Sequence, residues 1–353
     1  MNDNKKRFYE YGLIGASFPR GARNSISDVQ GVRVGHATKI EGEDVRTGVT
    51  VVDPGTKDLF KNKVPGAIAV GNGYGKLTGI TQVEELGTIE APIALTSTLA
   101  VGAALQGMIA VVSAHETLGP IDGPNVIVGE INDGFLNDIH ANSVTKEDVK
   151  RAYENLSEDF LIGNVGGGTG SRAFSWKGGI GTSSRVIAIE SKKYTLGVLV
   201  QTNFGGSLSI AGVPLGKILG KSDFDEFLKE NHGGSCMIVL ATDAPFSARQ
   251  LKRIASRTFL GLARTGSVIS PTSGDYAIAF STDRAGVEGE EGNVLLQDSI
   301  LYRFFLAAVE ATEEAVFDAL FAAETLRGRD GNVREAIPVE RVVEIIKNYR
   351  HGA

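Results

Sequence analysis

One apolar run constrains the fold of this chain more than any other stretch of it. Residues 236–241 are continuously apolar, and structure-breaking residues bound them: Gly233 and Gly234 with Ser235 on one side, and 243–245 (Asp-Ala-Pro) on the other. An apolar run of this length without polar alternation predicts a strand that is buried on both faces. The chain must therefore cover both sides of a sheet, and Ser235 lies at the mouth of a core strand.

The position of Ser235 has two interpretations. In the first, the glycine pair is an ordinary turn that opens a strand, which is the commoner meaning of such a local pattern. In the second, the Gly234–Ser235 bond is broken, so that Ser235 gains a free α-amine beside its hydroxyl. The pKa of an α-amino group is about 8, so part of it is neutral at pH 7 and can accept the hydroxyl proton. Glycine before the serine tolerates the strained backbone that an N→O acyl shift needs.

Composition excludes several classes of protein and of site. The 353 residues carry a net charge of −6, which argues against a nucleic acid or an anionic membrane as the main partner. Cys236 is the single cysteine, so neither an intramolecular disulfide nor a cysteine-based metal site is expected. The five histidines form no short-spaced metal pair, and a cysteine in an apolar strand is usually a small hydrophobic residue. With no signal peptide and no apolar run that we judge long enough to span a bilayer, we expect a cytoplasmic protein.

The remaining pattern predicts runs of strands and runs of helices. Period-2 and β-branched segments predict strands at 31–37, 47–54, 65–71, 125–130, 185–190, 194–202 and 275–282. Helical periodicity predicts helices at 97–116, 145–155 with a capping box, from Ser247 onward, and at 339–349, with two more in 298–327 that break near Ala311–Thr312. This order favours an α+β layered fold over a doubly wound sheet. Residues 223–230 are polar and are expected to form a surface linker, and no boundary is expected to divide residues 1–353 into separate domains.

The glycine-rich loops do not match the familiar phosphate or hydrolase motifs. Residues 168–173 satisfy G-x-G-x-x-A, but no strand leads into them and no helix follows. Residues 215–222 have Leu215 where a P-loop requires its first glycine, and 181–185 lack the closing glycine of G-x-S-x-G. The glycines of 163–181 are equally compatible with a pair of tight turns and with a wall of backbone amides beside a substrate.

Three further polar residues are candidates for chemistry. Ser273 and Asp275 lie two apart at the start of a predicted strand, so both project to one side and can share a hydrogen-bond network. Asn203 ends another strand and can donate its amide to an oxyanion. Taken alone, each has an ordinary alternative as a turn or loop residue.

Taken together, the segments resemble the P1 family of peptidases, the DmpA-like group of L-aminopeptidase/D-esterases and β-peptidyl aminopeptidases. The resemblance covers most of the chain, and its motifs occur in the family's order. They are 24–36, 46–50, 70–77, 81–87, 164–170, 177–182, 241–245 and 261–266.

The resemblance implies a four-layer αββα sandwich, similar to the N-terminal-nucleophile (Ntn) hydrolases, and a mechanism without metal or cofactor. It implies that the precursor cuts itself into an α chain, 1–234, and a β chain, 235–353, that assemble as a homotetramer of αβ units. The expected substrates are small peptides, amides or esters with a free amine. The implied roles are a nucleophile with its own amine as base (Ser235), an oxyanion donor (Asn203), a pair that orients the nucleophile (Ser273 and Asp275), an acid that binds the substrate ammonium (Glu130) and a second candidate for that cleft (Lys177).

One departure from the family pattern and two rival functions remain open. Asn132 stands where the family pattern is expected to have a tyrosine near the oxyanion or substrate site. An acyltransferase on the same fold is one rival, although such relatives typically have threonine at the cut, so Ser235 favours hydrolysis. An uncut, non-catalytic binding protein with a glycine-lined pocket is the other. The sequence does not decide between α- and β-peptides, amides and esters, or L and D residues.

Overall fold

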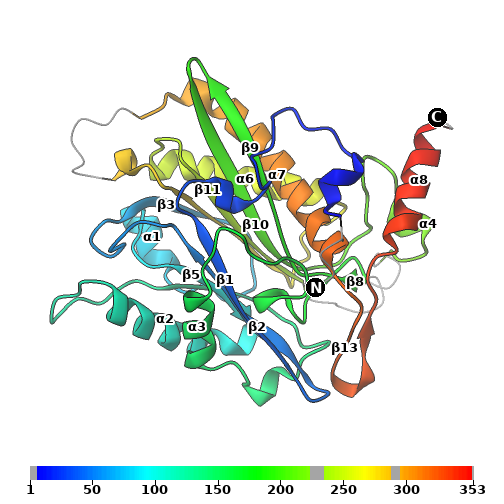
Figure 1. Cartoon of the computed structure of the whole chain (residues 1–353), viewed down its shortest axis with the longest axis horizontal. Coiled ribbons are helices and arrows are strands. Elements are labelled where there is room, and N and C mark those ends of the chain that lie inside the picture. Colours follow the sequence, from blue (N-terminus) through cyan, green and yellow to red (C-terminus); the bar gives the residue numbers. More distant parts are fainter. Residues whose placement is uncertain (1–5, 223–233, 288–294, 352–353) are drawn as a thin grey trace.

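Two β-sheets lie face to face with helices on their outer sides, which makes four layers, αββα (Figure 1). This is a computed structural model of the whole chain, and it describes residues 6–222, 234–287 and 295–351. The predicted α+β sandwich is confirmed. The predicted linker at 223–230 and the residue Gly233 lie outside the described residues.

The four-stranded sheet has the order β1-β2-β5-β6, and only its β5–β6 pair is parallel. The six-stranded sheet has the order β4-β3-β12-β11-β10-β9, and only its β11–β12 pair is parallel. The strands of the first sheet are β1 (Arg33–Glu41), β2 (Val45–Asp53), β5 (Ile93–Ser97) and β6 (Ile127–Ile131). Those of the second are β3 (Val64–Gly73), β4 (Thr88–Ile89), β9 (Ile180–Ile189), β10 (Lys192–Asn203), β11 (Ser235–Thr242) and β12 (Gly274–Ser281).

The helices cover the outer faces of the sheets. Helices α2 (Val101–His115) and α3 (Lys146–Glu154) pack on the four-stranded sheet, and α6 (Ala248–Arg264) and α7 (Leu301–Ala322) pack on the six-stranded sheet. The capping box predicted at Thr145 before α3 and the N-cap predicted at Ser247 before α6 are both present, and Ser247 also forms a capping box with Gln250. The other elements are α1 (Ile80–Leu86), α4 (Leu215–Ile218), α8 (Val339–His351) and the small hairpins β7 (Arg172–Ala173) with β8 (Trp176–Lys177) and β13 (Leu326–Arg327) with β14 (Val333–Arg334).

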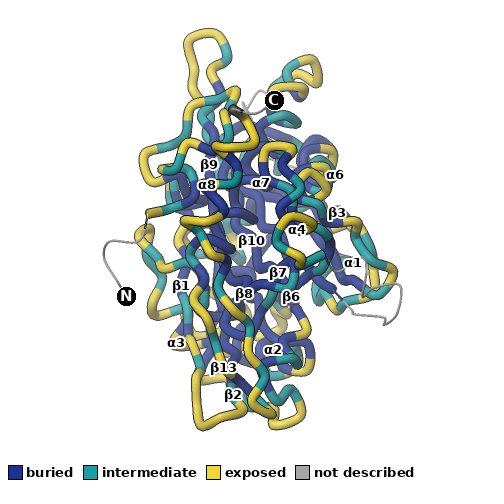
Figure 2. Tube along the Cα trace, turned by 90° about the vertical axis from the view of Figure 1, so that its right-hand side faces the viewer, coloured by how far each residue is buried: buried dark blue, intermediate teal, exposed yellow. Residues whose placement is uncertain are grey.

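Strand β11 is buried along its whole length, as its apolar run predicts. Because side chains alternate along a strand, Met237 and Val239 face the core between the two sheets, whereas Cys236 and Ile238 join the core under α6 and α7. Buried chain therefore runs through the middle of the molecule, and exposed chain is concentrated in the outer loops (Figure 2). The site at the start of β11 is consequently built on a rigid element.

The predicted break near Ala311–Thr312 is wrong, since α7 is continuous from Leu301 to Ala322. The Thr312 hydroxyl donates to the Ala308 carbonyl oxygen at 2.7 Å, so it is satisfied within the helix. The acidic residues that give this segment its polar appearance are instead buried against other parts of the chain.

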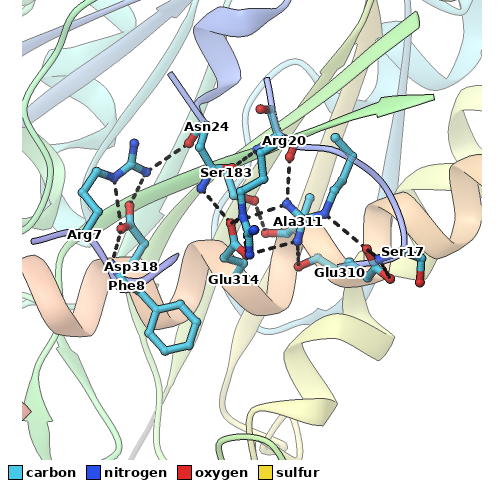
Figure 3. A network of polar contacts seen from close by, with 12 residues as sticks. Arg7, Phe8, Ser17, Arg20, Asn24, Ser183, Glu310, Ala311, Glu314 and Asp318 are labelled. Atoms are coloured by element: carbon cyan, nitrogen blue, oxygen red, sulfur yellow. Dashed lines mark hydrogen bonds and ion pairs between the residues drawn. The ribbon is translucent and has the colours of Figure 1, made fainter. Parts of the chain in front are cut away.

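A network of buried ion pairs joins α7 to β9 and to the N-terminal segment (Figure 3). Arg185 lies 3.2 Å from both Glu310 and Glu314, and Arg7 pairs with Asp318 at 2.6 Å. Buried charges are tolerated only when they are paired in this way. The network therefore fixes how α7 lies on the six-stranded sheet.

The segment Thr98–His115 is long and apolar enough to cross a membrane by length and composition alone, so the expectation of no such run was wrong. In this structure the segment forms a 3-10 turn and α2. Residues such as Ala104, Met108 and Val112 are buried in the core of the four-stranded sheet. The apolar character of this segment is thus used for packing.

The glycine-dense segment at 163–181 is mainly a structural device. A Cβ atom on Gly166, whose φ is +50°, would lie 2.4 Å from the hydroxyl oxygen of Thr50, and one on Gly168 would lie 2.6 Å from the amide nitrogen of Ile180. Neither approach leaves room for a side chain. These glycines let neighbouring backbones pass closely, which favours the tight-turn interpretation.

Candidate active site

Ser235 begins β11 between two strands that carry other candidate residues. In the antiparallel pair with β10 it lies opposite Asn203, and in the parallel pair with β12 it lies opposite Gly274. Ser235 and Asn203 are both almost completely buried. The sheet register therefore brings together residues that are more than thirty positions apart in the sequence.

The Ser235 hydroxyl is directed at the bond before it. Its Oγ donates to the Gly234 carbonyl oxygen at 2.5 Å. The Gly274 amide N–H is shared between this carbonyl oxygen, at 3.2 Å, and Ser235 Oγ, at 3.4 Å. Negative charge develops on a carbonyl oxygen when a nucleophile attacks its carbon, and a preplaced N–H stabilises that charge. The Ser235 hydroxyl and the Gly274 N–H thus both contact the carbonyl group of Gly234.

The Asn203 amide is held by backbone groups on both of its ends. Nδ2 donates to the Asn132 carbonyl oxygen at 2.9 Å, and Oδ1 accepts from the Arg172 amide at 3.3 Å. The Asn132 side chain accepts from the Gly134 amide at 3.0 Å in a local turn. Asn132, at the position where a tyrosine was expected, therefore holds the Asn203 side chain through its backbone carbonyl oxygen.

Ser273 and Asp275 form a buried polar pair next to the same bond. A Cβ atom on Gly234 would lie 3.1 Å from Ser273 Oγ, so this hydroxyl lies beside the residue before Ser235. Ser273 Oγ and both carboxylate oxygens of Asp275 are buried without a hydrogen bond of normal geometry. Burial raises the pKa of Asp275 to about 6, and the nearby Ser273 hydroxyl opposes this shift. Unsatisfied buried groups at one place indicate a site kept for chemistry.

A cavity of about 630 Å³ opens in front of Ser235. It is lined by Tyr74, Gly75, Lys76, Thr98, Leu99, Glu130, Asn132, Phe135, Ile139, His140, Arg172, Gly234, Ser235 and Thr272. Glu130 and Ser235 therefore face one space, as their suggested roles require. Asn203 ends β10, Asp275 lies in β12 and Ser273 immediately precedes β12, and none of the three is among the residues that line the cavity.

One carboxylate oxygen of Glu130 accepts a hydrogen bond, and the other has no hydrogen-bond partner. Its Oε1 accepts from the Lys76 backbone amide at 2.9 Å, and the Lys76 ammonium lies 3.8 Å from the same oxygen. Its Oε2 is buried and has no hydrogen-bond partner. A buried carboxylate with a free acceptor is a suitable site for a substrate ammonium.

Lys177, another predicted site residue, also lies outside the residues that line this cavity. It is fully buried, and its Nζ donates to the carbonyl oxygens of Gly178 at 2.8 Å and Gly168 at 3.2 Å. Burial lowers the pKa of Lys177 to about 7. These contacts give Lys177 a supporting position behind the Gly168 turn, outside the residues that line the cavity.

Sequence reasoning missed two contributors, Lys76 and Gly274. The Gly274 position must be a glycine because a Cβ atom there would lie 2.6 Å from the Gly75 Cα atom. Its one available signal was its place between Ser273 and Asp275. Lys76 belongs to the Gly-rich loop after β3, and no local pattern shows that this loop returns to Glu130.

The described residues offer neither a cluster of metal ligands nor an exposed thiol at this site. Among the described residues, no group of three or more histidine, cysteine, aspartate or glutamate side chains is arranged to hold a metal ion. Cys236, the neighbour of Ser235, faces the core under α6 and α7, and burial raises the pKa of its thiol well above the usual value. The candidate nucleophile of this strand is thus the Ser235 hydroxyl.

Comparison with known proteins identifies the family of this chain. The model of peptidase family S58 matches residues 24–334. The chain is 38% identical to beta-peptidyl aminopeptidase BapA of Sphingosinicella microcystinivorans, over 94% of this chain and 90% of the relative.

Two solved structures are also similar to this chain over nearly its whole length. The PH0078 protein from Pyrococcus horikoshii OT3 is 43% identical with a TM-score of 0.89, covering 98% of this chain and 99% of that one. The L-aminopeptidase D-Ala-esterase/amidase from Ochrobactrum anthropi, described as a prototype for the serine aminopeptidases and a variant of the Ntn hydrolase fold, is 33% identical with a TM-score of 0.87, covering 97% and 98%. The chain therefore belongs to peptidase family S58 and is a serine-type aminopeptidase/amidohydrolase.

Proposed function

We propose that this protein cuts its own Gly234–Ser235 bond and then uses Ser235 to release N-terminal residues from small peptides, amides or esters. The two products of the cut are chains 1–234 and 235–353. One observation carries the proposal: Ser235 Oγ lies 2.5 Å from the Gly234 carbonyl oxygen, and the Gly274 N–H points at that same oxygen. A nucleophile and an oxyanion donor thus already face one peptide bond.

In the self-cleavage step, Ser235 Oγ attacks the Gly234 carbonyl carbon and loses its proton. The C–N bond breaks, an ester forms between Gly234 and the Ser235 oxygen, and the nitrogen becomes a free α-amine. Water then hydrolyses the ester, which leaves a carboxylate on Gly234 and an N-terminal Ser235. Ser273, beside Gly234, is placed to hydrogen-bond the new amine, and Asp275 supplies a carboxylate close by.

In the catalytic step, the same hydroxyl attacks the first carbonyl of a bound substrate. The Ser235 α-amine takes the hydroxyl proton and returns it to the leaving amine. Asn203, opposite Ser235 in the sheet, donates to the oxyanion. Water then releases the acyl group. Every group in this sequence comes from the chain itself, so the mechanism needs neither metal nor cofactor.

Glu130 gives the site its requirement for a free amine. Glu130 lines the same cavity as Ser235, and its Oε2 has no hydrogen-bond partner, so the substrate ammonium binds Glu130 while the scissile carbonyl reaches Ser235. The similarity to a relative named beta-peptidyl aminopeptidase supports a β-amino acid at the substrate N-terminus. Nucleic acids and membranes are not proposed as partners.

The test of self-cleavage is an intact mass spectrum under denaturing conditions. The unaltered protein is expected to give two chains that meet between Gly234 and Ser235, whereas Ser235→Ala gives one full-length, inactive chain. Ser256→Ala, in α6 and outside the cavity, is the matched control and should be cut normally. An uncut unaltered protein that binds small amines would favour the binding-protein rival, and acyl transfer to an added amine faster than hydrolysis would favour the acyltransferase.

We also propose a cytoplasmic location and a homotetramer of αβ units. The single, buried cysteine is compatible with a reducing compartment. The tetramer rests on the family resemblance. Sedimentation equilibrium of the processed protein measures the mass of the assembly directly.

A further inference from the structure

The charges around the cavity do not match a substrate that carries only an ammonium group. Among the described residues that line it, Glu130 is the one acidic side chain, whereas Lys76 and Arg172 are basic. Once Glu130 binds a substrate ammonium, its charge is shared between that ammonium and Lys76. The Lys76 ammonium is then only partly neutralised by Glu130, which favours an anionic group on the substrate.

Lys76 is the basic side chain that lies next to Glu130 in this cavity. Its ammonium is 3.8 Å from Glu130 Oε1, the oxygen next to the open Oε2. Its Nζ donates to the Thr98 hydroxyl at 2.8 Å, and the lysine side chain is 55% exposed. Because an ammonium has three N–H donors, this one can keep Thr98 and still donate to a ligand in the cavity.

We propose that the site prefers substrates whose N-terminal residue carries an ammonium and a carboxylate on the same carbon, and specifically β-aspartyl amides and peptides. The ammonium binds Glu130 and the carboxylate binds Lys76. The Lys76 ammonium lies 3.8 Å from the Glu130 carboxylate. A substrate with an ammonium and a carboxylate on one carbon can therefore contact both side chains at once. The inference rests on the proposed function, since it assigns the substrate class of the same cavity.

The choice of a β-aspartyl group follows from the number of bonds between the substrate ammonium and the scissile carbonyl. A β-aspartyl residue is a β-alanyl residue with a carboxylate added on the carbon that bears the amine, so both place the ammonium at the same number of bonds from the scissile carbonyl. The reaction is unchanged: Ser235 Oγ forms an ester with the side-chain carbonyl, the leaving amine takes the proton, and water releases free aspartate. The two substrates therefore differ only in the group that Lys76 would bind.

The experiment compares kcat/KM for L-β-aspartyl and β-alanyl p-nitroanilides in the processed enzyme. This leaving group has no carboxylate, so any effect of charge comes from the N-terminal residue. We expect the β-aspartyl substrate to be favoured by about tenfold to a hundredfold, the range typical of one charge-assisted contact. In Lys76→Met the ratio should fall to one or below, and Lys76→Arg should keep most of it.

The measured quantity is the ratio of kcat/KM for the two substrates. A loss of activity that affects both substrates equally therefore cancels. Lys61→Met, an exposed lysine outside the cavity, is the matched control and should keep the unaltered ratio. Thr98→Val tests the same contact independently, because it removes the hydroxyl that holds Lys76, and should lower the ratio. Hydrolysis of the β-alanyl substrate without preference for β-aspartyl, or a ratio unchanged in Lys76→Met, overturns this inference alone. Hydrolysis of neither substrate overturns the proposed function with it.

Discussion

Asp275 is expected to lower the stability of the protein at neutral pH. Its carboxylate is buried beside Ser273 without a normal hydrogen bond, and burial raises its pKa from 3.8 to about 6. The unfolded chain therefore releases this proton at a lower pH than the folded chain does. The resulting penalty on folding is absent below pH 4, grows as the pH rises to about 6, and is complete above that.

The size of the penalty follows from the shift. Two pKa units correspond to about 3 kcal/mol of lost stability at pH 8. Unfolding of 353 residues has an entropy of about 0.7 kcal/mol/K, so this is about 4 °C in Tm. Replacement by asparagine removes the titration but keeps the shape of the side chain.

The assay is urea unfolding of Ser235→Ala and of Ser235→Ala with Asp275→Asn at pH 4 and pH 8. The Ser235→Ala background keeps a single chain, so unfolding involves no separation of two chains. Between these pH values the first protein should lose about 2.5 kcal/mol more stability than the second, because a small part of the penalty is already present at pH 4. Comparing across pH cancels any constant cost of burying an amide. Asp44→Asn, an exposed aspartate, is the control and should not reproduce the effect. An equal pH dependence in both proteins would refute a buried, unpaired carboxylate at 275.

Two further predictions concern paired acids. Glu130→Gln should lower kcat/KM for amine-bearing substrates by about tenfold to a hundredfold, because a charge-assisted contact becomes neutral. Self-cleavage, measured by mass spectrometry, should persist, since it involves no free ammonium; its loss would contradict a role confined to substrate binding. Arg185→Met should lower the free energy of unfolding by about 3–5 kcal/mol, because Glu310 and Glu314 lose a buried partner. Urea unfolding measures it, and a change below about 1 kcal/mol would show that the remaining partners of these acids suffice.

Local sequence patterns predicted the elements whose cause is local. The apolar run after Ser235 predicted β11, because an all-apolar strand needs a sheet covered on both faces. The caps at Thr145 and Ser247 predicted where α3 and α6 begin, since a capping box is a contact between residues three apart. Short elements with weak patterns, such as β5 and α1, were missed.

The break predicted in α7 shows where such reasoning fails. Acidic residues in a helix suggest a solvent-facing turn or an end, but Glu310, Glu314 and Asp318 are buried against arginines from elsewhere in the chain. Their partners are more than a hundred residues away in the sequence. Periodicity within the helix contains no information about them.

The sequence by itself determined the family motifs, the central strand and the serine at its start. It did so because these depend on residues that are neighbours in the chain. Only the tertiary structure decided that Gly274 donates to the Gly234 carbonyl oxygen, that Lys177 lies behind the cavity, and that Lys76 pairs with Glu130. Each of these contacts depends on the register of strands or on the path of a loop. They are set by the packing of the two sheets as a whole, which is why no local pattern of residues predicts them.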